Sequence, residues 1–435
     1  MYKLFSKDIF FYFAPLLPLT FIVGIFVTEI FMFLITLIFL LWNKDFSCFK
    51  DSKFFFLFLI SIYIAINAFV QIGDDLKISS IFYFRYIFFS LAIVFCLKNL
   101  ENINKDIAII ITNIFFIVIS LVVLDAFFQF LVGVNTFGFK IINNRISGIF
   151  GEELILGSFL VKTIPIFTWL IFFTNFNIKK NQNKLIIFFS CCMLCVFLTG
   201  ERTSIGLLSL FFLLVIVFIR PLKKIFFLSS LNFLLLVIVI SFFQIGKSDP
   251  INRIFIKTFN QFTNNYFVTK NSNNSSTKTL DVNKKILKNN LLIFSKEHTG
   301  HYQLAFNLFK ENPIFGIGPK GFRFYCRTVK YDPKIGFCST HPHNFFVQIS
   351  SETGLVGLII FLYLFFFVLY KLINCFKNYN HDREQLLLML ISICILVNLF
   401  PLFPSGNFFN NWISIINYYY IGIYIYSYNR SYNKI

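Results

Sequence analysis

Long apolar runs recur from one end of the chain to the other, and they constrain the fold more than any other feature. Each run is about as long as the 17–25 residues that a helix needs to cross a bilayer. The expected spans lie near 9–25, 27–42, 54–72, 78–97, 107–132, 152–175, 184–200, 203–219, 224–245, 350–373, 385–404 and 411–428. Hydrophobic residues make up 57% of the chain, as is typical of membrane proteins. The sequence predicts an all-α integral membrane protein with about 12 transmembrane helices.

The distribution of basic residues predicts the orientation of these spans. Twelve spans place both termini on the same side of the membrane. The loops on that side are rich in lysine, and the positive-inside rule assigns such loops to the cytoplasm. The short loops opposite carry only Lys77, Lys140, Arg145 and Arg202. The chain divides into helices 1–9 in residues 1–245, one large outer loop in 246–343 and helices 10–12 in 344–435. Within the outer loop, the helical spacing of Tyr302, Ala305, Phe306 and Phe309 predicts a short amphipathic helix on the membrane that ends at Pro313. The first apolar run has no small-residue cleavage site, so no cleavable signal peptide is expected.

The net charge of +19 does not indicate a nucleic-acid-binding protein. Its basic residues are dispersed between apolar spans and form no basic stripe on one face. We therefore expect membrane lipids, and no nucleic acid, among the partners of this chain.

A stretch at the end of the outer loop, from His341 to Gly357, carries the most chemistry. It reads His-Pro-His-Asn-Phe-Phe-Val-Gln-Ile-Ser-Ser-Glu-Thr-Gly-Leu-Val-Gly. Helical spacing places five residues on a single face: His343, Val347, Ser350, Gly354 and Gly357. The side chains that follow the imidazole on this face are small. A second, polar stripe holds Asn344, Gln348 and Glu352, which inside a membrane need a cavity or a partner. An imidazole at the outer surface is a candidate general base.

His343-Asn344, nine residues, Gly354, two residues and Gly357 resemble the signature of the bacterial O-antigen ligases. The resemblance implies a glycosyltransferase of the O-antigen ligase/polymerase superfamily in the bacterial inner membrane. It would transfer a glycan from undecaprenyl diphosphate to lipid A–core on the periplasmic face. His343 would be the base, Asn344 would orient its ring, and Gly354 and Gly357 would let a neighbouring helix approach closely.

Basic side chains on the outer side are candidates for binding the diphosphate. Ligases of this family carry an arginine at the hairpin where Arg202 lies, although Glu201 replaces the expected small residue beside it. Arg145, Arg323 and Lys320 lie in outer loops, and Arg85 lies about two turns inside a span, where an arginine is costly unless it faces a cavity. His298 and His301 stand where the family has an arginine, a role that Arg323 would take over.

Three further expectations concern the outer side. Cys326 and Cys338 should form a disulfide, because both lie in a loop exposed to the oxidising periplasm. Asp74 and Asp75 lack a third ligand nearby, so no metal or cofactor is expected. Glu29 is expected to be a solvated turn residue.

Alternative functions of two classes stay open at this point. The same donor chemistry would serve an O-antigen polymerase or a protein O-oligosaccharyltransferase, which differ from a ligase in their acceptor. A polysaccharide or lipid transporter belongs to another class, and should show internal repeats or broken spans at the midplane. The sequence has no such repeat, which favours the enzyme.

Overall fold

The structure, a computed structural model, describes residues 11–43, 52–71, 80–101, 105–260, 296–327 and 338–432. The first part contains α1 (Phe13–Leu16), η3 (Leu17–Ile22), α2 (Ile25–Trp42), α3 (Ser52–Gln71), η5 (Phe82–Phe84), α5 (Arg85–Glu101) and α6 (Lys105–Val132). The middle contains η6 (Gly148–Phe150), α7 (Leu156–Phe173), α8 (Gln182–Leu198), α9 (Arg202–Phe218), η7 (Arg220–Leu222), α10 (Lys223–Phe242) and η8 (Asn252–Ile256). The last part contains α13 (Lys296–Glu311), α14 (Phe322–Tyr325), α15 (Phe345–Lys377), α16 (Arg383–Asn398) and α17 (Asn411–Tyr432).

The all-helical prediction is confirmed for the described residues, where the only extended pairings are two isolated bridges in one loop. Every expected span overlaps a helix. In the part of the chain that the structure describes, 6 helices are long and apolar enough to cross a bilayer: Ile25–Trp42, Phe82–Leu100, Ile109–Val132, Leu156–Phe173, Arg220–Phe242 and Phe345–Lys377. Four shorter apolar helices accompany them: Phe13–Ile22, Phe55–Val70, Gln182–Leu198 and Arg202–Phe218. The chain is a multi-pass membrane protein, and the number of twelve crossings stays a prediction.

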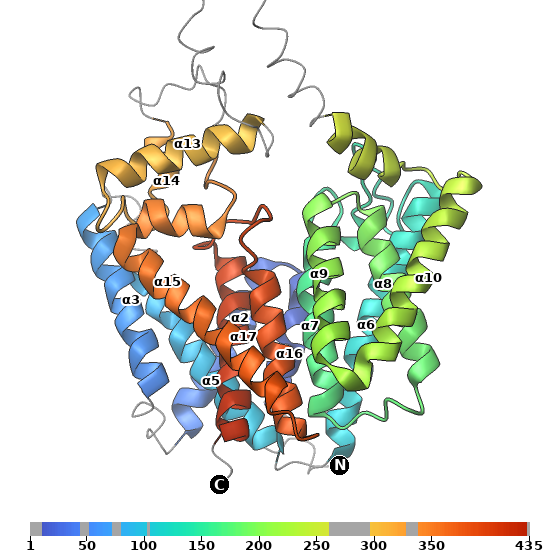
Figure 1. Cartoon of the computed structure of the whole chain (residues 1–435), viewed down its shortest axis with the longest axis horizontal. Coiled ribbons are helices and arrows are strands. Elements are labelled where there is room, and N and C mark those ends of the chain that lie inside the picture. Colours follow the sequence, from blue (N-terminus) through green and yellow to red (C-terminus); the bar gives the residue numbers. More distant parts are fainter. Residues whose placement is uncertain are drawn as a thin grey trace, which may run out of the picture.

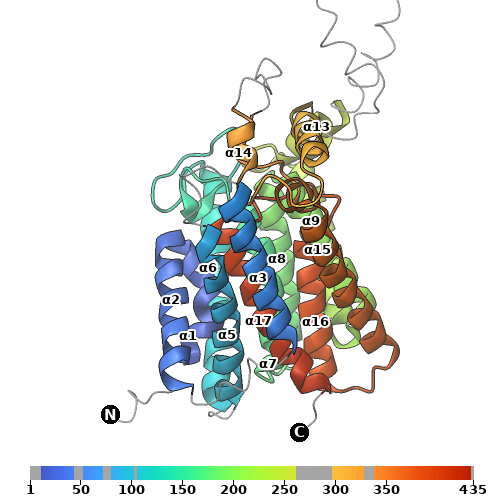
Figure 2. The same ribbon diagram turned by 90° about the vertical axis from the view of Figure 1, so that its left-hand side faces the viewer.

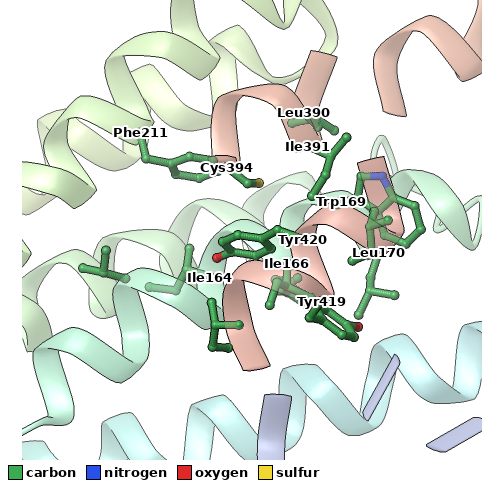
Figure 3. Packing of buried hydrophobic residues seen from close by; sticks show 14 of the residues in the cluster. Ile164, Ile166, Trp169, Leu170, Phe211, Leu390, Ile391, Cys394, Tyr419 and Tyr420 are labelled. Atoms are coloured by element: carbon green, nitrogen blue, oxygen red, sulfur yellow. The ribbon is translucent and has the colours of Figure 1, made fainter. Parts of the chain in front are cut away.

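The helices form two groups joined through the middle of the bundle. In Figure 1, α6, α8, α9 and α10 lie together on one side, α3, α5 and α15 lie on the other, and α7, α16 and α17 lie between them. Figure 3 shows the join, where Tyr419 and Tyr420 of α17 pack with Trp169 of α7, Phe211 of α9 and Leu390 of α16. All five side chains are fully buried. Outward faces stay apolar, as lipid requires, and Phe242 at the end of α10 is 79% exposed.

One end of the bundle carries the elements that build the candidate site. The short helix α14 and the amphipathic helix α13 cap this end, while α1 and the end of α17 lie at the opposite end (Figures 1 and 2). Helix α13 occupies the stretch in which the sequence predicts an amphipathic helix, and it ends two residues before Pro313. Ala305 and Leu308 of α13 are buried against Ile317 and Phe322, so the helix is packed onto the loop that follows it.

Candidate functional site

The segment His343–Asn344 forms the start of α15. Asn344 is the N-cap, and its Oδ1 accepts hydrogen bonds from the backbone N–H groups of Phe346 at 3.0 Å and Val347 at 3.2 Å. This is the usual way to satisfy the first donors of a helix. His343 lies just outside the helix with φ of 60°. The expected helical face that began at His343 is therefore wrong, because the ring projects from a turn that precedes the helix.

Gly354 interrupts α15, with φ of 64° and ψ of −165°. Figure 1 shows α15 changing direction between its first turns and its long lower part. A Cβ atom on Gly354 would lie 2.2 Å from the carbonyl oxygen of Ile314, and one on Gly316 would lie 2.5 Å from the carbonyl carbon of Glu352. The close approach expected of Gly354 is thus to the backbone of the 313–316 segment and not to a neighbouring helix. Gly357 leaves space for Thr353, whose Oγ1 would be 2.0 Å from an added Cβ.

The loop after α13 is hydrogen-bonded to the opened turn at Gly354. Backbone N–H groups of Ile317 and Gly318 donate to the carbonyls of Ser351 at 3.0 Å and Glu352 at 2.9 Å. In the other direction, the N–H of Leu355 donates to the carbonyl of Pro313 at 2.8 Å. The break in the helix frees these groups for pairing, and the loop pairs them.

The polar stripe finds its partners in two loops. Gln348 Nε2 donates to Glu352 Oε2 at 3.0 Å and to Asn407 Oδ1 at 2.8 Å, while Asn344 Nδ2 donates to the carbonyl of Pro401 at 2.7 Å. The fully buried Glu352 accepts the backbone N–H of Lys320 at 3.0 Å and that of Phe322 at 3.2 Å. These hydrogen bonds fix the Gly316–Gly321 turn over the start of α15.

Lys320 and Arg323 project from this turn among other cations. Burial lowers the pKa of Lys320, and the positive charges of Arg323 and Arg85 lower it further. Arg85 donates to Asn411 Oδ1 at 3.2 Å and lies 4.0 Å from Glu29, to which Asn411 also donates. Glu29 is therefore an ion-pair partner of Arg85, and the expectation of a solvated turn residue is wrong. The structure gathers Arg85, Lys320 and Arg323 from distant parts of the sequence.

Four imidazole rings meet at the His343 turn. The ring centroid of His343 lies 4.1 Å from that of His341, 5.3 Å from that of His301 and 5.4 Å from that of His298. His343 Nε2 is 3.1 Å from Ser339 Oγ. Burial lowers the pKa of His343 to about 3, and the other three histidines lower it further. Burial likewise lowers the pKa of His341 to about 4. Both rings are therefore unprotonated at neutral pH.

No set of three or more His, Cys, Asp or Glu side chains among the described residues has an arrangement that could hold a metal ion. This includes the four histidines. Asp74 and Asp75 lie outside the described residues.

A loop between α16 and α17 connects the His343 turn to α9. The N–H of Ser405 donates to the carbonyl of His343 at 2.8 Å, and the carbonyl of Ser405 lies 3.3 Å from His341 Nε2. The ring of Phe403 in the same loop packs against Gly206, where an added Cβ would lie 2.6 Å from the ring. Gly206 is about one helical turn from Arg202. The loop therefore places the His343 turn and the start of α9 on two sides of one short segment.

Arg202 begins α9 at the tip of the predicted hairpin. Its Nε and Nη2 donate to the carbonyl of Arg253 at 3.2 and 3.0 Å, and Arg253 Nε donates to the carbonyl of Gly200 at 3.1 Å. A Cβ on Gly200 would lie 2.7 Å from Arg253 Cδ. Arg253 is a site residue that sequence reasoning missed. The only signal for it was an arginine on the outer side of a lysine-rich chain.

The structure accommodates Glu201, which departs from the family pattern, through an ion pair and through the absence of a side chain at Gly157. It forms an ion pair with Arg145 at 3.0 Å and accepts hydrogen bonds from Ser204 at 2.7 Å and Ser158 at 3.2 Å. A Cβ on Gly157 would lie 2.9 Å from its carboxyl carbon, so glycine there makes room for it. The added negative charge is neutralised by Arg145 and not by Arg202.

A cavity of about 860 Å³ adjoins this hairpin. Its cationic lining consists of Lys140, Arg145, Lys247, Arg253 and Lys257. Arg145 is the only predicted site residue in the lining, and Lys247 and Lys257 were missed because nothing in the sequence brings them to Arg145. The cavity lies on the side of the α6–α10 group, whereas the histidines lie on the α15 side.

A disulfide attaches the segment just before His341 to the residues that follow α14. Cys326 and Cys338 are bonded with their Cα atoms 5.4 Å apart, within the roughly 7 Å that a disulfide needs. Cys326 is buried with Ala305, Leu308 and Phe322, so the bond connects the chain just ahead of His341 to the packed α13 layer. Cys191, Cys192 and Cys195 are free, and the last two are fully buried in the bundle.

No curated protein matches the chain. Residues 186–362 match the O-antigen ligase family. This range runs from α8 through the break in α15, and it contains Arg202, Arg323, His343, Gly354 and Gly357. The chain is thus a multi-pass membrane protein in which residues 186–362 are similar to the O-antigen ligase family.

Proposed function

We propose that the protein is a glycosyltransferase that moves a glycan from undecaprenyl diphosphate to lipid A–core on the periplasmic face of the inner membrane. The observation that carries the proposal is the environment of His343. A neutral imidazole sits just before the capped start of α15, against the ring of His341, on which the positive charge of Arg323 acts, and within the family-matched range. A base next to cations suits a reaction in which a hydroxyl attacks and a diphosphate leaves.

In the proposed reaction His343 removes the proton from an acceptor hydroxyl. The acceptor oxygen then forms a bond to the anomeric carbon of the donor sugar while the bond from that carbon to the diphosphate oxygen breaks. The electron pair leaves with the diphosphate, and the configuration at the anomeric carbon inverts. Asn344 contributes by fixing the turn, since it caps α15 and binds the carbonyl of Pro401. The step uses no nucleotide and no metal.

Cations on both sides of the 399–410 loop would neutralise the leaving group. Arg323, Lys320 and Arg85 lie on the histidine side, where their charges already act on one another. Arg202 lies on the α9 side. The guanidinium of Arg145 is paired with Glu201, so Arg145 would help to neutralise the leaving group only together with the neighbouring Arg253. Charge stabilisation of this kind supplies a large part of the rate in many transferases.

In the proposed topology, the end of the bundle that carries the candidate site faces the periplasm. Helix α13, the histidine turn and the 399–410 loop would face the periplasm, and both termini would face the cytoplasm after twelve crossings. The grouping of α13 and α14 at the end opposite α1 and the close of α17 supports this arrangement (Figure 2).

The test is a transfer assay with the purified full chain, undecaprenyl-diphosphate-linked glycan and lipid A–core. His343→Ala should reduce transfer by roughly 10²–10⁴-fold, the usual contribution of a general base, with donor binding retained. His381→Ala is the matched control, since His381 is exposed in the loop between α15 and α16. Transfer by the His343→Ala variant at the wild-type rate would refute the proposed base.

The acceptor is tested in the same assay. Elongation of the lipid-linked glycan itself would identify a polymerase, and modification of a protein would identify an oligosaccharyltransferase. Either result, without transfer to lipid A–core, would overturn the ligase assignment and keep the donor chemistry.

A further inference from the structure

The break in α15 at Gly354 is filled by groups from outside the helix. In a regular helix the carbonyls of residues 351–353 would accept hydrogen bonds from the N–H groups of residues 355–357. The non-helical Gly354 opens these three rungs, and the 313–318 segment fills two of them. The bonds run from the N–H of Ile317 to Ser351 at 3.0 Å, of Gly318 to Glu352 at 2.9 Å, of Leu355 to Pro313 at 2.8 Å and of Val356 to Ile314 at 3.3 Å. Both sides of the first two rungs are therefore bonded to the segment.

The third rung is filled by a side chain of another helix, Tyr63 of α3. Its hydroxyl donates to the carbonyl of Thr353 at 2.5 Å, and the N–H of Gly357 hydrogen-bonds to the same oxygen. Thr353 and Gly357 are the two residues that this rung would join in a regular helix. Every backbone group of the three opened rungs therefore has a partner, and Tyr63 provides the last two bonds.

Asn67, one turn further along α3, binds the inserted segment itself. Its Nδ2 donates to the carbonyl of Phe315 and, at 3.2 Å, to the hydroxyl of Tyr63. Asn67 is 4% exposed, and its Oδ1 has no hydrogen-bond partner among the described residues. A buried amide destabilises a helix in an apolar environment unless it is bonded. The two bonds that Nδ2 donates are therefore what the amide contributes at this position.

Helix α3 is otherwise an apolar helix at the edge of the bundle, beside α15 (Figure 1). It packs against η5 and α5, and its exposed side chains include Ile66, Phe69 and Val70, as expected of a surface in lipid. Hydrophobic contact alone would hold such a helix in place. Tyr63 and Asn67, which we call the α3 pair, add polar bonds that are directed at the break in α15 and at the segment within it.

We propose that the α3 pair positions the site: Tyr63 and Asn67 hold the 313–318 segment in the break of α15 and thereby fix Lys320 and Arg323. Lys320 follows the segment by two residues, and its N–H is bonded to Glu352 of the same broken helix at 3.0 Å. A shift of the segment would therefore move both cations. The catalytic consequence rests on the proposed function, in which these cations neutralise the leaving group, whereas the mechanical role of the α3 pair does not.

Hydrogen exchange of the purified full chain in detergent tests the mechanical role without any substrate. The variants are Tyr63→Phe, which removes one hydroxyl, and Asn67→Ala. The reporters are the amides of Ile317 and Gly318, which are bonded to α15 and not to the α3 pair. Their exchange should become roughly fivefold faster in each variant, the usual effect of one lost hydrogen bond.

Tyr363→Phe is the matched control, because Tyr363 lies on α15 and is 59% exposed. It should leave the exchange of both reporters unchanged. Amides of the buried helix α16 should exchange at the wild-type rate in all variants. Unchanged exchange of the reporters in both α3 variants, or an equal rise in α16, would overturn the proposal, since the pair would then hold nothing or would act only on the whole fold.

The pH profile of chemical labelling at Lys320 tests whether the pair positions this cation. Burial lowers the pKa of Lys320, and the charges of Arg323 and Arg85 lower it further. Release of the segment should return the pKa toward its ordinary value, so acylation of Lys320 should require a higher pH in both α3 variants. Exposed Lys310 on α13 is the internal control, and its profile should stay the same. A wild-type profile at Lys320 in variants with faster exchange would overturn the positioning role.

Steady-state transfer then connects the α3 pair to the proposed reaction. In both variants kcat should fall by roughly fivefold, with an unchanged KM for the lipid-linked donor, because displaced cations stabilise less of the charge that develops in the transition state. Wild-type kcat in the variants would refute the catalytic consequence. A wild-type protein without transfer activity would instead refute the proposed function, and the exchange and labelling results would still decide whether the α3 pair holds the segment.

Discussion

The His343 turn and the Arg202 hairpin lie on two sides of the same short loop, yet they are built in opposite ways. The His343 turn is assembled from α13, the 313–322 loop, α15 and the 399–410 loop, with buried neutral rings and backbone bonds between segments. The Arg202 hairpin brings several charged side chains together beside an open cavity lined by basic residues. Burial keeps the His343 ring neutral but also makes it a weaker base, whereas an open basic surface suits a group that must attract an anion.

The largest expected effect is on the assembled side. Gly354→Ala should destabilise the protein by about 3 kcal/mol or more, since a Cβ would overlap the carbonyl of Ile314 and φ of 64° is strained for alanine. Gly138→Ala is the matched control, because Gly138 has φ of 88° but nothing within 4 Å of an added Cβ. Thermal unfolding in detergent measures both. Equal losses in the two variants would show that backbone strain alone matters and that the docked loop does not.

The disulfide should matter nearly as much, and again on the assembled side. Replacing both Cys326 and Cys338 with alanine should lower stability by about 3 kcal/mol, the chain-entropy expectation for a short closed loop. The His343 turn should loosen with it, which hydrogen exchange of residues 338–345 would report. Unchanged exchange in this segment would separate the disulfide from the site.

A smaller effect is expected at the hairpin. Arg202→Lys keeps the charge but loses the two-pronged contact with the carbonyl of Arg253, which an ammonium group cannot reproduce. The KM for the lipid-linked donor should rise by roughly tenfold, equivalent to about 1.4 kcal/mol, with kcat less affected. The same change at exposed Arg220 serves as the control. A fall in kcat with unchanged KM would assign Arg202 to the transition state and not to donor binding.

A further expected effect is the pH dependence of stability. The folded-state pKa values of His341 and His343 are lowered to about 4 and about 3, so the unfolded chain binds protons first as the pH falls. Their contribution is complete above the unfolded value of about 6.5 and is lost as the pH falls from there toward 4. The unfolding temperature of the wild type should drop across this window more than that of His341→Gln, while exposed His381→Gln should behave as the wild type. A parallel decline in all three proteins would contradict the burial of these rings.

The sequence by itself determined that the chain is a membrane protein and where its helices lie. It also determined that His343 and Asn344 stand at the start of one of these helices. These features are local: an apolar run forms a helix in lipid because each helix satisfies its own backbone, and an asparagine caps the helix that follows it. The tertiary structure alone decided that Gly354 breaks α15 to receive the 313–318 loop, that His298 and His301 meet His343, and that Arg85 pairs with Glu29. Each of these depends on packing between segments far apart in the chain, and a buried polar group takes whichever partner that packing supplies.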